Sequence, residues 1–382
     1  MNQHEYDVIV IGGGIVGAST AYHLSRDGAR TLLIDRRDEG RATNAGAGIL
    51  APEMNKRDPD EWFFFAVDAV DYYPTLVAEL AAQHAGETSY ARCGMLLVAA
   101  TPDELADYRE AEAYILARQA ARGTPPTDDL RVVTPAEAKE LFPALADVHG
   151  AIYYRSAARV DGRLMAAALL NGAAGHGLTV LNAGVDELLL TGARVTGVRV
   201  GQQEFGASAV VIAGGAWSTF FGRQLGVTIP VEPQRGQIIH WEVAGAATGE
   251  WPIVSAFHGH YIVCWPDGRV VTGATRESGS GYAPVTSAVG IREVIDEALR
   301  VAPGLATARL VEVRVGLRPY PQDGLPVLGP VPGMDGIILA TGHGPTGLQL
   351  GPFSGKQAAR LAMGRAPDVD ISAFSVARFN RG

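Results

Sequence analysis

The first hydrophobic pattern in the chain is a run of four β-branched residues, 8–11, which stops at three glycines. A run this short suits a strand covered on both faces better than a buried helix. After the glycines, apolar residues recur at helical spacing over 15–24, and Gly28 marks the end of the predicted helix. The run 31–34 predicts a second strand. Together these segments predict a strand–helix–strand unit of a parallel sheet.

Two later apolar runs, 210–213 and 337–340, predict further buried strands; the first runs into two glycines and the second is followed by a glycine-rich loop. Between residues 230 and 317, alternating segments separated by turn residues indicate antiparallel strands. The nucleotide-type segments are thus scattered along the chain, and a second domain is inserted between them. The expected boundaries are 1–88, 150–228 and 321–382 for the first domain, and 89–149 and 229–320 for the inserted domain.

Composition limits the function without identifying it. The 382 residues are enough for two domains, and a net charge of −9 offers no basic surface for nucleic acid or an anionic membrane. Cys93 and Cys264 have no metal-ligand spacing, so a reducing cytoplasm is expected. No apolar run is long enough to predict a transmembrane helix. The aromatic segment 62–73 is interpreted as core or domain-interface packing, with a membrane or partner contact as the alternative.

The glycines after the first strand have the spacing of a dinucleotide-binding turn. Gly12 permits the tight turn, Gly14 lets a pyrophosphate approach the backbone, and Gly17 lets the helix pack closely on the strand. Asp35 ends the second strand, where an acid can accept the ribose hydroxyls of an adenosine. Two arginines follow, and because Asp35 would repel a 2′-phosphate, we expect them to be solvated or to lie on the pyrophosphate. The full order of elements predicts a dinucleotide site rather than a turn without a ligand.

Four segments, in this order and spacing, resemble the D-amino-acid oxidase family of flavoproteins. They are "DVIVIGGGIVGASTAYHLSRDG" near the N-terminus, "PQRGQ" at 233–237, "GLRPYPQDGLPVLGPVP" at 316–332 and "GHGPTGLQLGP" at 342–352. The resemblance spans essentially the whole chain. It implies an α/β fold with a Rossmann-like FAD-binding domain and an inserted α+β substrate-binding domain built on a mixed, largely antiparallel sheet. It also implies that an amino acid lies over the flavin ring beneath that sheet.

The resemblance implies three catalytic residues. Arg318 matches the arginine that holds the substrate carboxylate, Tyr261 resembles a tyrosine that hydrogen-bonds the same carboxylate, and His343 belongs to the loop along the flavin edge. The competing interpretations are a structural arginine, a packed core tyrosine and an ordinary loop histidine. The expected cofactor contacts are Gly12, Gly14, Ile15, Val16, Gly17, Asp35, Arg36, Arg37, Thr43, Asn44, Ala45, Gly46, Gly48, Val185, Gly214, Trp217, Arg318, Gly344, Thr346, Gly347 and Leu348.

The chain departs from the family pattern at two places. Glycine oxidases have a basic residue in the final loop where this chain has Pro345, which leaves the choice of glycine as substrate open. Monomeric sarcosine oxidases tether the flavin through a cysteine, and "RPYPQDG" at 318–324 has none, so FAD is expected to bind non-covalently. No metal is expected, because His258 and His260 stand at i and i+2 without an apparent third ligand.

The expected reaction is oxidation of the C–N bond of a small amino acid, namely a D-amino acid, glycine or an N-methyl amino acid. A neutral amine delivers its α-hydrogen to flavin N5 as hydride, and water hydrolyses the imine to a 2-oxo acid. A helix expected from about Pro352 would direct its positive end at the flavin pyrimidine. Oxygen or a quinone-type acceptor would reoxidise the flavin, and a homo-oligomer is left open. The alternatives are a nicotinamide-dependent dehydrogenase and a flavoprotein subunit of a multi-chain amine dehydrogenase.

Overall fold

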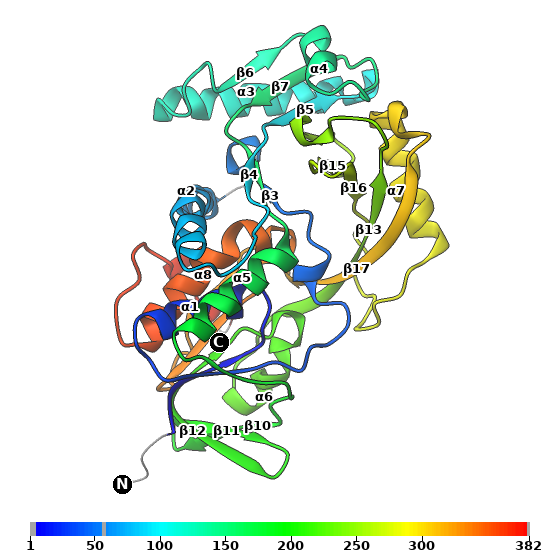
Figure 1. The fold of residues 1–382 in the computed structure, drawn as a ribbon. Coiled ribbons are helices and arrows are strands. Elements are labelled where there is room, and N and C mark those ends of the chain that lie inside the picture. The colour runs from blue at the N-terminus through cyan, green and yellow to red at the C-terminus, as the bar shows by residue number, and fades with distance from the viewer. Residues whose placement is uncertain (1–4, 56–58, 380–382) are drawn as a thin grey trace.

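The computed structural model describes residues 5–55 and 59–379 and contains two large sheets (Figure 1). In the first sheet, parallel strands run in the order β9–β2–β1–β12–β19. β18 pairs antiparallel with β19, and a β10–β11 hairpin extends from the first half of β12. The strands of this sheet are β1 (Tyr6–Ile11), β2 (Thr31–Ile34), β9 (Thr179–Leu181), β10 (Glu187–Thr191), β11 (Arg194–Val200), β12 (Gln203–Ile212), β18 (Val327–Pro330) and β19 (Ile337–Thr341).

Strand β1 is covered on both faces, which explains its unbroken apolar run. Val8 and Val10 pack into the core beneath the helices, whereas Ile9 and Ile11 pack into a second core on the opposite face. The helices of the first core are α1 (Ile15–Arg26), α2 (Asp60–Ala82), α5 (Gly162–Gly175) and α8 (Gly347–Ala362). On the other face lies the short α6 (Gly222–Leu225), which contributes Leu225 to the second core.

The aromatic segment lies in α2 and packs mainly into the core. Trp62, Phe63, Phe65 and Tyr73 are each at most 3% exposed, so core packing is confirmed for these four side chains. Phe65 meets Phe353 of α8, with 5.3 Å between the ring centroids. Of the other two aromatic residues in this segment, Tyr72 is partly buried and Phe64 is 51% exposed. Among the described residues, no helix is long and apolar enough to cross a membrane.

The second sheet is mixed and largely antiparallel, in the order β17–β13–β16–β15–β14–β5–β7–β6. Only the β14–β5 pair in this order is parallel. Its strands are β5 (Met95–Ala99), β6 (Leu130–Val133), β7 (Gly150–Tyr154), β13 (Val231–Glu242), β14 (Ile253–Ser255), β15 (Tyr261–Cys264), β16 (Arg269–Gly273) and β17 (Arg309–Pro321). The helices on this part of the chain are α3 (Leu105–Arg122), α4 (Pro135–Leu141) and α7 (Ala288–Val301).

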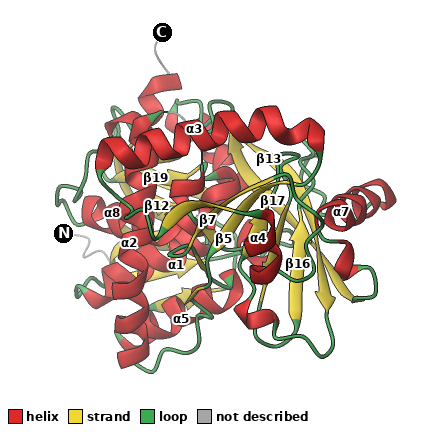
Figure 2. Cartoon of the chain, turned by 90° about the horizontal axis from the view of Figure 1, so that it is seen from above, coloured by secondary structure: helices red, strands yellow, loops and turns green. Residues whose placement is uncertain are grey.

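The two sheets are joined by a small sheet of β3 (Ile49–Leu50), β8 (Ala158–Arg159) and β4 (Ala91–Arg92). Seen from above, α1, α2, α5 and α8 gather on one side, and β13, β16 and β17 lie on the other with α7 outside them (Figure 2). The expected fold class, a Rossmann-like part combined with a mixed sheet, is therefore confirmed.

Candidate cofactor and substrate site

A cavity of about 610 Å³ lies where the parallel strands end, below the long strands of the second sheet. Its wall includes Ile11 and Ile34, the last residues of β1 and β2, together with Ala213 just beyond β12. On the other side it is lined by residues of β13, β15 and β17. The carboxyl ends of parallel strands are where open α/β sheets bind ligands.

The glycine turn between β1 and α1 brings bare backbone to this cavity. Gly12 has a φ of +101°, and a Cβ there would lie 2.5 Å from the Ala213 carbonyl oxygen. A Cβ on Gly17 would lie 1.8 Å from the Gly12 carbonyl oxygen, so Gly17 serves the packing of α1 and is not part of the cavity wall. Gly14 caps α1 without a side-chain hydrogen bond, while Ile15 N donates to Thr43 Oγ1 at 3.0 Å. Gly14, Ile15 and Val16 line the cavity.

The residues after β2 divide between the cavity and the surface. Asp35 lines the cavity, and its Oδ2 accepts a hydrogen bond from Arg41 Nη1 at 2.5 Å. Arg36 also lines it while its Nε donates to Asp38 at 2.8 Å. Arg37 is exposed and lies outside the cavity wall, so the structure does not bring it to the other predicted contacts.

The loop that follows contributes several residues to the cavity wall. Thr43, Ala45, Gly46 and Gly48 line it, whereas Asn44 does not and instead accepts a hydrogen bond from Arg163 on its carbonyl oxygen. The loop is fixed by close packing, since a Cβ on Gly48 would lie 1.8 Å from the Val160 carbonyl oxygen. Val185, Gly214 and Trp217 line the same cavity from the loops beyond β9 and β12.

Helix α8 begins at Gly347, so the prediction of a start near Pro352 was wrong. Gly344, Thr346, Gly347 and Leu348 line the cavity, and Thr346 caps the helix without a side-chain hydrogen bond. The positive end of α8 therefore opens directly into the cavity. Proline is common in the first turn of a helix, so Pro352 suggested that the helix begins there. In the structure Pro352 lies just beyond the first turn of α8.

Two buried side chains near this helix start differ in their partners. His343 is 3% exposed and shares a 2.9 Å hydrogen bond between its Nε2 and Ser354 Oγ. Burial lowers the pKa of His343 to about 4, so the imidazole is neutral at pH 7. Gln349 Oε1 accepts from Ala51 N at 3.1 Å, but its buried Nε2 has no hydrogen-bond partner in the described part of the chain. Such an amide is a donor available to a ligand in the cavity.

Arg318 and Tyr261 form the polar wall under the second sheet. Arg318 Nη1 donates to the Thr275 carbonyl oxygen at 2.9 Å. Its guanidinium lies across Gly236, where a Cβ would come within 2.4 Å of Nη2. Burial lowers the pKa of Arg318 and raises that of Tyr261, while each group's interaction with the other opposes the effect of burial. The two side chains therefore act as neighbours in one electrostatic site.

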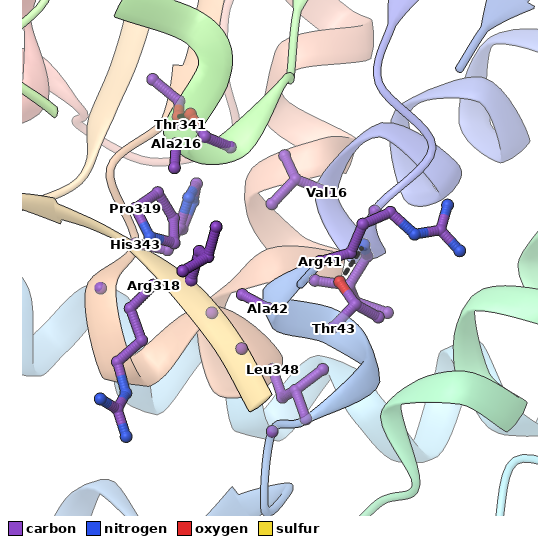
Figure 3. A pocket seen from close by; sticks show the side chains of 18 of the residues that line it. Val16, Arg41, Ala42, Thr43, Ala216, Arg318, Pro319, Thr341, His343 and Leu348 are labelled. Atoms are coloured by element: carbon purple, nitrogen blue, oxygen red, sulfur yellow. Dashed lines mark hydrogen bonds between the residues drawn. The ribbon is translucent and has the colours of Figure 1, made fainter. Parts of the chain in front are cut away.

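Figure 3 shows Arg318 and Arg41 pointing away from each other, toward opposite ends of the pocket. Arg41 is at the end beside Asp35, and Arg318 is at the end beside Tyr261. The cavity thus has a nucleotide-type end and an anion-type end.

The sequence did not point to many residues of this cavity, among them Arg41, Gly236, Arg276 and Gln349. Gly236 stood within the quoted "PQRGQ" segment, and Gln349 stood within the last quoted segment. Neither had a role because the partners of both, Arg318 and Ala51, are distant in sequence. Arg41 and Arg276 follow strands in irregular segments, where no periodicity distinguishes them from surface arginines.

The two histidines considered as metal ligands instead face glutamates. His258 Nδ1 lies 2.9 Å from Glu297, and His260 Nε2 lies 3.3 Å from Glu293. Within residues 5–55 and 59–379, no group of three or more histidine, cysteine or acidic side chains is arranged to hold a metal.

The donor set fits a dinucleotide cofactor that extends through the cavity. Two helix starts without side-chain caps, a glycine turn and an unpartnered amide face the same space. Backbone donors at helix starts suit phosphate and other anionic groups. The fold and the site define a dinucleotide-binding class of protein.

Comparison with known proteins makes the assignment specific. Residues 7–361 match the model of the DAO family, described as FAD dependent oxidoreductase, and the chain belongs to this family. The uncharacterized oxidoreductase YurR of Bacillus subtilis is 39% identical over 370 residues, covering 97% of this chain and 98% of that protein. Glycine oxidase of Pseudomonas aeruginosa is 31% identical over 374 residues, covering 97% and 98%.

The crystal structure of iminodiacetate oxidase from Chelativorans sp. BNC1 matches with a TM-score of 0.91 at 39% identity, covering 96% of this chain and 98% of that one. The predicted family resemblance is confirmed, and the cofactor is FAD rather than a nicotinamide.

Proposed function

We propose that this chain oxidises the C–N bond of a small amino acid with a primary or secondary amine, giving an imine that water hydrolyses to a 2-oxo acid. The observation that carries the proposal is Arg318, a guanidinium on the cavity wall beside Tyr261 with no carboxylate of the described residues within 4 Å. Two of the relatives described above are named glycine oxidase and iminodiacetate oxidase, and both names denote compounds of this class.

FAD would be held along the cavity by the segments already described. The α1 turn and Asp35 would take the adenosine diphosphate part, Val185 would lie by the adenine, and the 43–48 loop would pass the flavin ring with 344–348. The start of α8 would favour negative charge on the ring. Bound FAD would supply the two-electron acceptor for the hydride of the amine.

The chain's own contribution is positioning and electrostatics. Arg318 would fix the substrate carboxylate by a bidentate pair, and Tyr261 would donate its hydroxyl to the same group. Arg318 is a cation and His343 is neutral, so neither residue supplies a negative charge that would stabilise an ammonium group. The neutral form of the substrate amine is therefore favoured. The neutral amine is the form able to release hydride.

The test is the absorption spectrum of the purified protein before and after anaerobic addition of glycine, sarcosine, iminodiacetate, D-alanine or D-aspartate. A yellow protein whose flavin absorption is lost with at least one of them supports the proposal. A flavin that none of the five reduces contradicts it. Activity only in the presence of another chain would support the alternative of a subunit in a multi-chain dehydrogenase.

We infer that oxygen or a quinone-type acceptor reoxidises the flavin, and one preparation can decide between them. Hydrogen peroxide formed in step with substrate loss indicates an oxidase. Reduction of a quinone or dye without peroxide indicates a dehydrogenase.

A further inference from the structure

A second guanidinium, that of Arg276, lines the same cavity as Arg318. Arg276 Nη1 donates to the Gly259 carbonyl oxygen at 2.7 Å, and a Cβ on Gly259 would lie 2.4 Å from that nitrogen. The arrangement repeats that of Arg318, whose guanidinium lies across Gly236 and donates to one carbonyl. In each case a glycine leaves room for the planar group, and further N–H donors remain for a ligand.

The neighbouring acid in the sequence, Glu277, does not form an ion pair with Arg276. Glu277 accepts hydrogen bonds from Arg235, Gln237 and Thr275. No carboxylate in the described chain lies within 4 Å of Arg276, and its positive charge lowers the pKa of both Arg318 and Tyr261. Arg276 therefore lies close enough to act on the same ligand as these two residues.

The acidic residues that line the cavity lie at the nucleotide-type end, away from Arg318 and Arg276. Asp35 and Asp38 follow β2, and Asp186 precedes β10. The end under the second sheet thus has two guanidinium groups and no lining carboxylate among the described residues. Arg276 is an exposed residue, so water also reaches its guanidinium, whereas Arg318 is partly buried. A substrate with one carboxylate would pair with Arg318 alone, and a second carboxylate would pair with Arg276 as well.

We propose that the substrate is an amino dicarboxylate, with one carboxylate held by Arg318 and Tyr261 and the second held by Arg276. This inference rests on the proposed function. The second carboxylate can be on the nitrogen substituent, as in iminodiacetate, or on the side chain, as in aspartate. Both have the same recognition chemistry, and substrate pairs that differ only in this carboxylate distinguish them.

Binding can be measured without turnover. Diglycolate has the two carboxylates of iminodiacetate but an ether oxygen in place of the amine, and methoxyacetate lacks the second carboxylate. We expect diglycolate to perturb the flavin spectrum of the holoenzyme with a Kd at least tenfold below that of methoxyacetate. Arg276→Gln should reduce this ratio to within about threefold, and Arg276→Lys should recover part of it. Arg292→Gln, which removes an exposed arginine of α7 outside the cavity, should leave the ratio unchanged.

Turnover gives the second readout. For the parent protein, kcat/KM for iminodiacetate over sarcosine, or for D-aspartate over D-alanine, should exceed about tenfold, and the larger ratio identifies the position of the second carboxylate. Arg276→Gln should lower that ratio by ten- to a hundredfold. The inference is overturned if the parent shows no preference in either pair, or if Arg276→Gln lowers both members of a pair equally. Reduction of the flavin by sarcosine, glycine or D-alanine in that case would leave the proposed function intact, whereas no reduction by any of the five amino acids would overturn both.

Discussion

At the level of single residues, the site depends on a few charged groups that lie against the backbone of glycines. The place of Arg318 on the cavity wall could be predicted because the residue lies in a specific segment, between a strand-like run and a proline. Its pairing with Gly236 could not, because the register of β13 against β17 places the two segments together across some eighty residues. Arg276 gave no signal, since an arginine after a strand is ordinarily a solvated residue.

Replacing Arg318 tests the carboxylate role. Arg318→Ala removes a charge-assisted pair of about 1.5–3 kcal/mol, so kcat/KM for amino acids should fall by at least about ten- to a hundredfold. Arg318→Lys keeps the charge without the fork and should recover only part. FAD content should stay near that of the parent. Steady-state kinetics with flavin quantification checks this, and a loss of FAD, or a change within twofold for amino acids, would assign Arg318 a structural role.

The lowered pKa of His343 leads us to expect that the stability of the protein depends on pH. Its folded pKa of about 4 lies below the ordinary value of 6.5, so the unfolded chain binds a proton more readily. The contribution is fully present above pH 6.5 and is lost as the pH falls toward 4, by at most about 3 kcal/mol.

The comparison variant is His343→Gln, whose side-chain amide offers a polar group toward Ser354 in place of the imidazole and does not titrate. Denaturant unfolding between pH 7 and 4 should show a smaller loss of unfolding free energy for His343→Gln than for the parent. His23 and His240, whose pKa values burial also lowers, contribute equally to both proteins. Equal losses in the two proteins would show that His343 does not titrate as described.

At the scale of elements, strands were predictable where burial on both faces leaves an unbroken apolar run, as in β1, β12 and β19. The start of α8 was misplaced by about five residues. Its first turn is "GLQL", and the preceding glycines and Pro345 read as loop. The helix is held there by tertiary contacts that include Gly355 against Ser19 and Val16 of α1, which local sequence does not encode.

Close packing of the start of α1 against the glycine turn after β1 depends on Gly17. In Gly17→Ala the new methyl would lie 1.8 Å from the Gly12 carbonyl oxygen, so the helix start must move. We expect a loss of about 1–3 kcal/mol of unfolding free energy and weaker retention of FAD on dilution. Gly175→Ala, on α5 with nothing within 4 Å of its Cβ, is the matched control and should lower neither the unfolding free energy nor FAD retention. Full FAD retention in Gly17→Ala would contradict the packing role.

At the scale of the whole molecule, the order of the segments predicted two structural parts, and long-range pairing built the cavity between them. The parallel β14–β5 pair joins residues far apart in sequence, and no alternating pattern identifies such a pairing. We propose the domain boundaries given by the sequence as the division between FAD-binding and substrate-binding parts, with one correction. The boundary at residue 150 was too early, because β7 (Gly150–Tyr154) pairs with β5 and β6 in the second sheet.

Attachment of the cofactor is also a property of the whole site. Neither Cys93 nor Cys264 lines the cavity, so no thiol is placed to tether the flavin. Acid precipitation should release FAD into the supernatant, and yellow colour retained in the pellet would show a covalent bond.

Anaerobic product analysis on the yellow holoenzyme tests most directly whether the protein oxidises the C–N bond of an amino acid. When a small amino acid reduces the flavin without oxygen, each flavin reduced should be accompanied by one 2-oxo acid, because C–N oxidation and imine hydrolysis are coupled one to one. Iminodiacetate, for example, should give glyoxylate and glycine in equal amounts. Flavin reduction without a matching 2-oxo acid, or no reduction by any member of the amino-acid panel, would contradict the account.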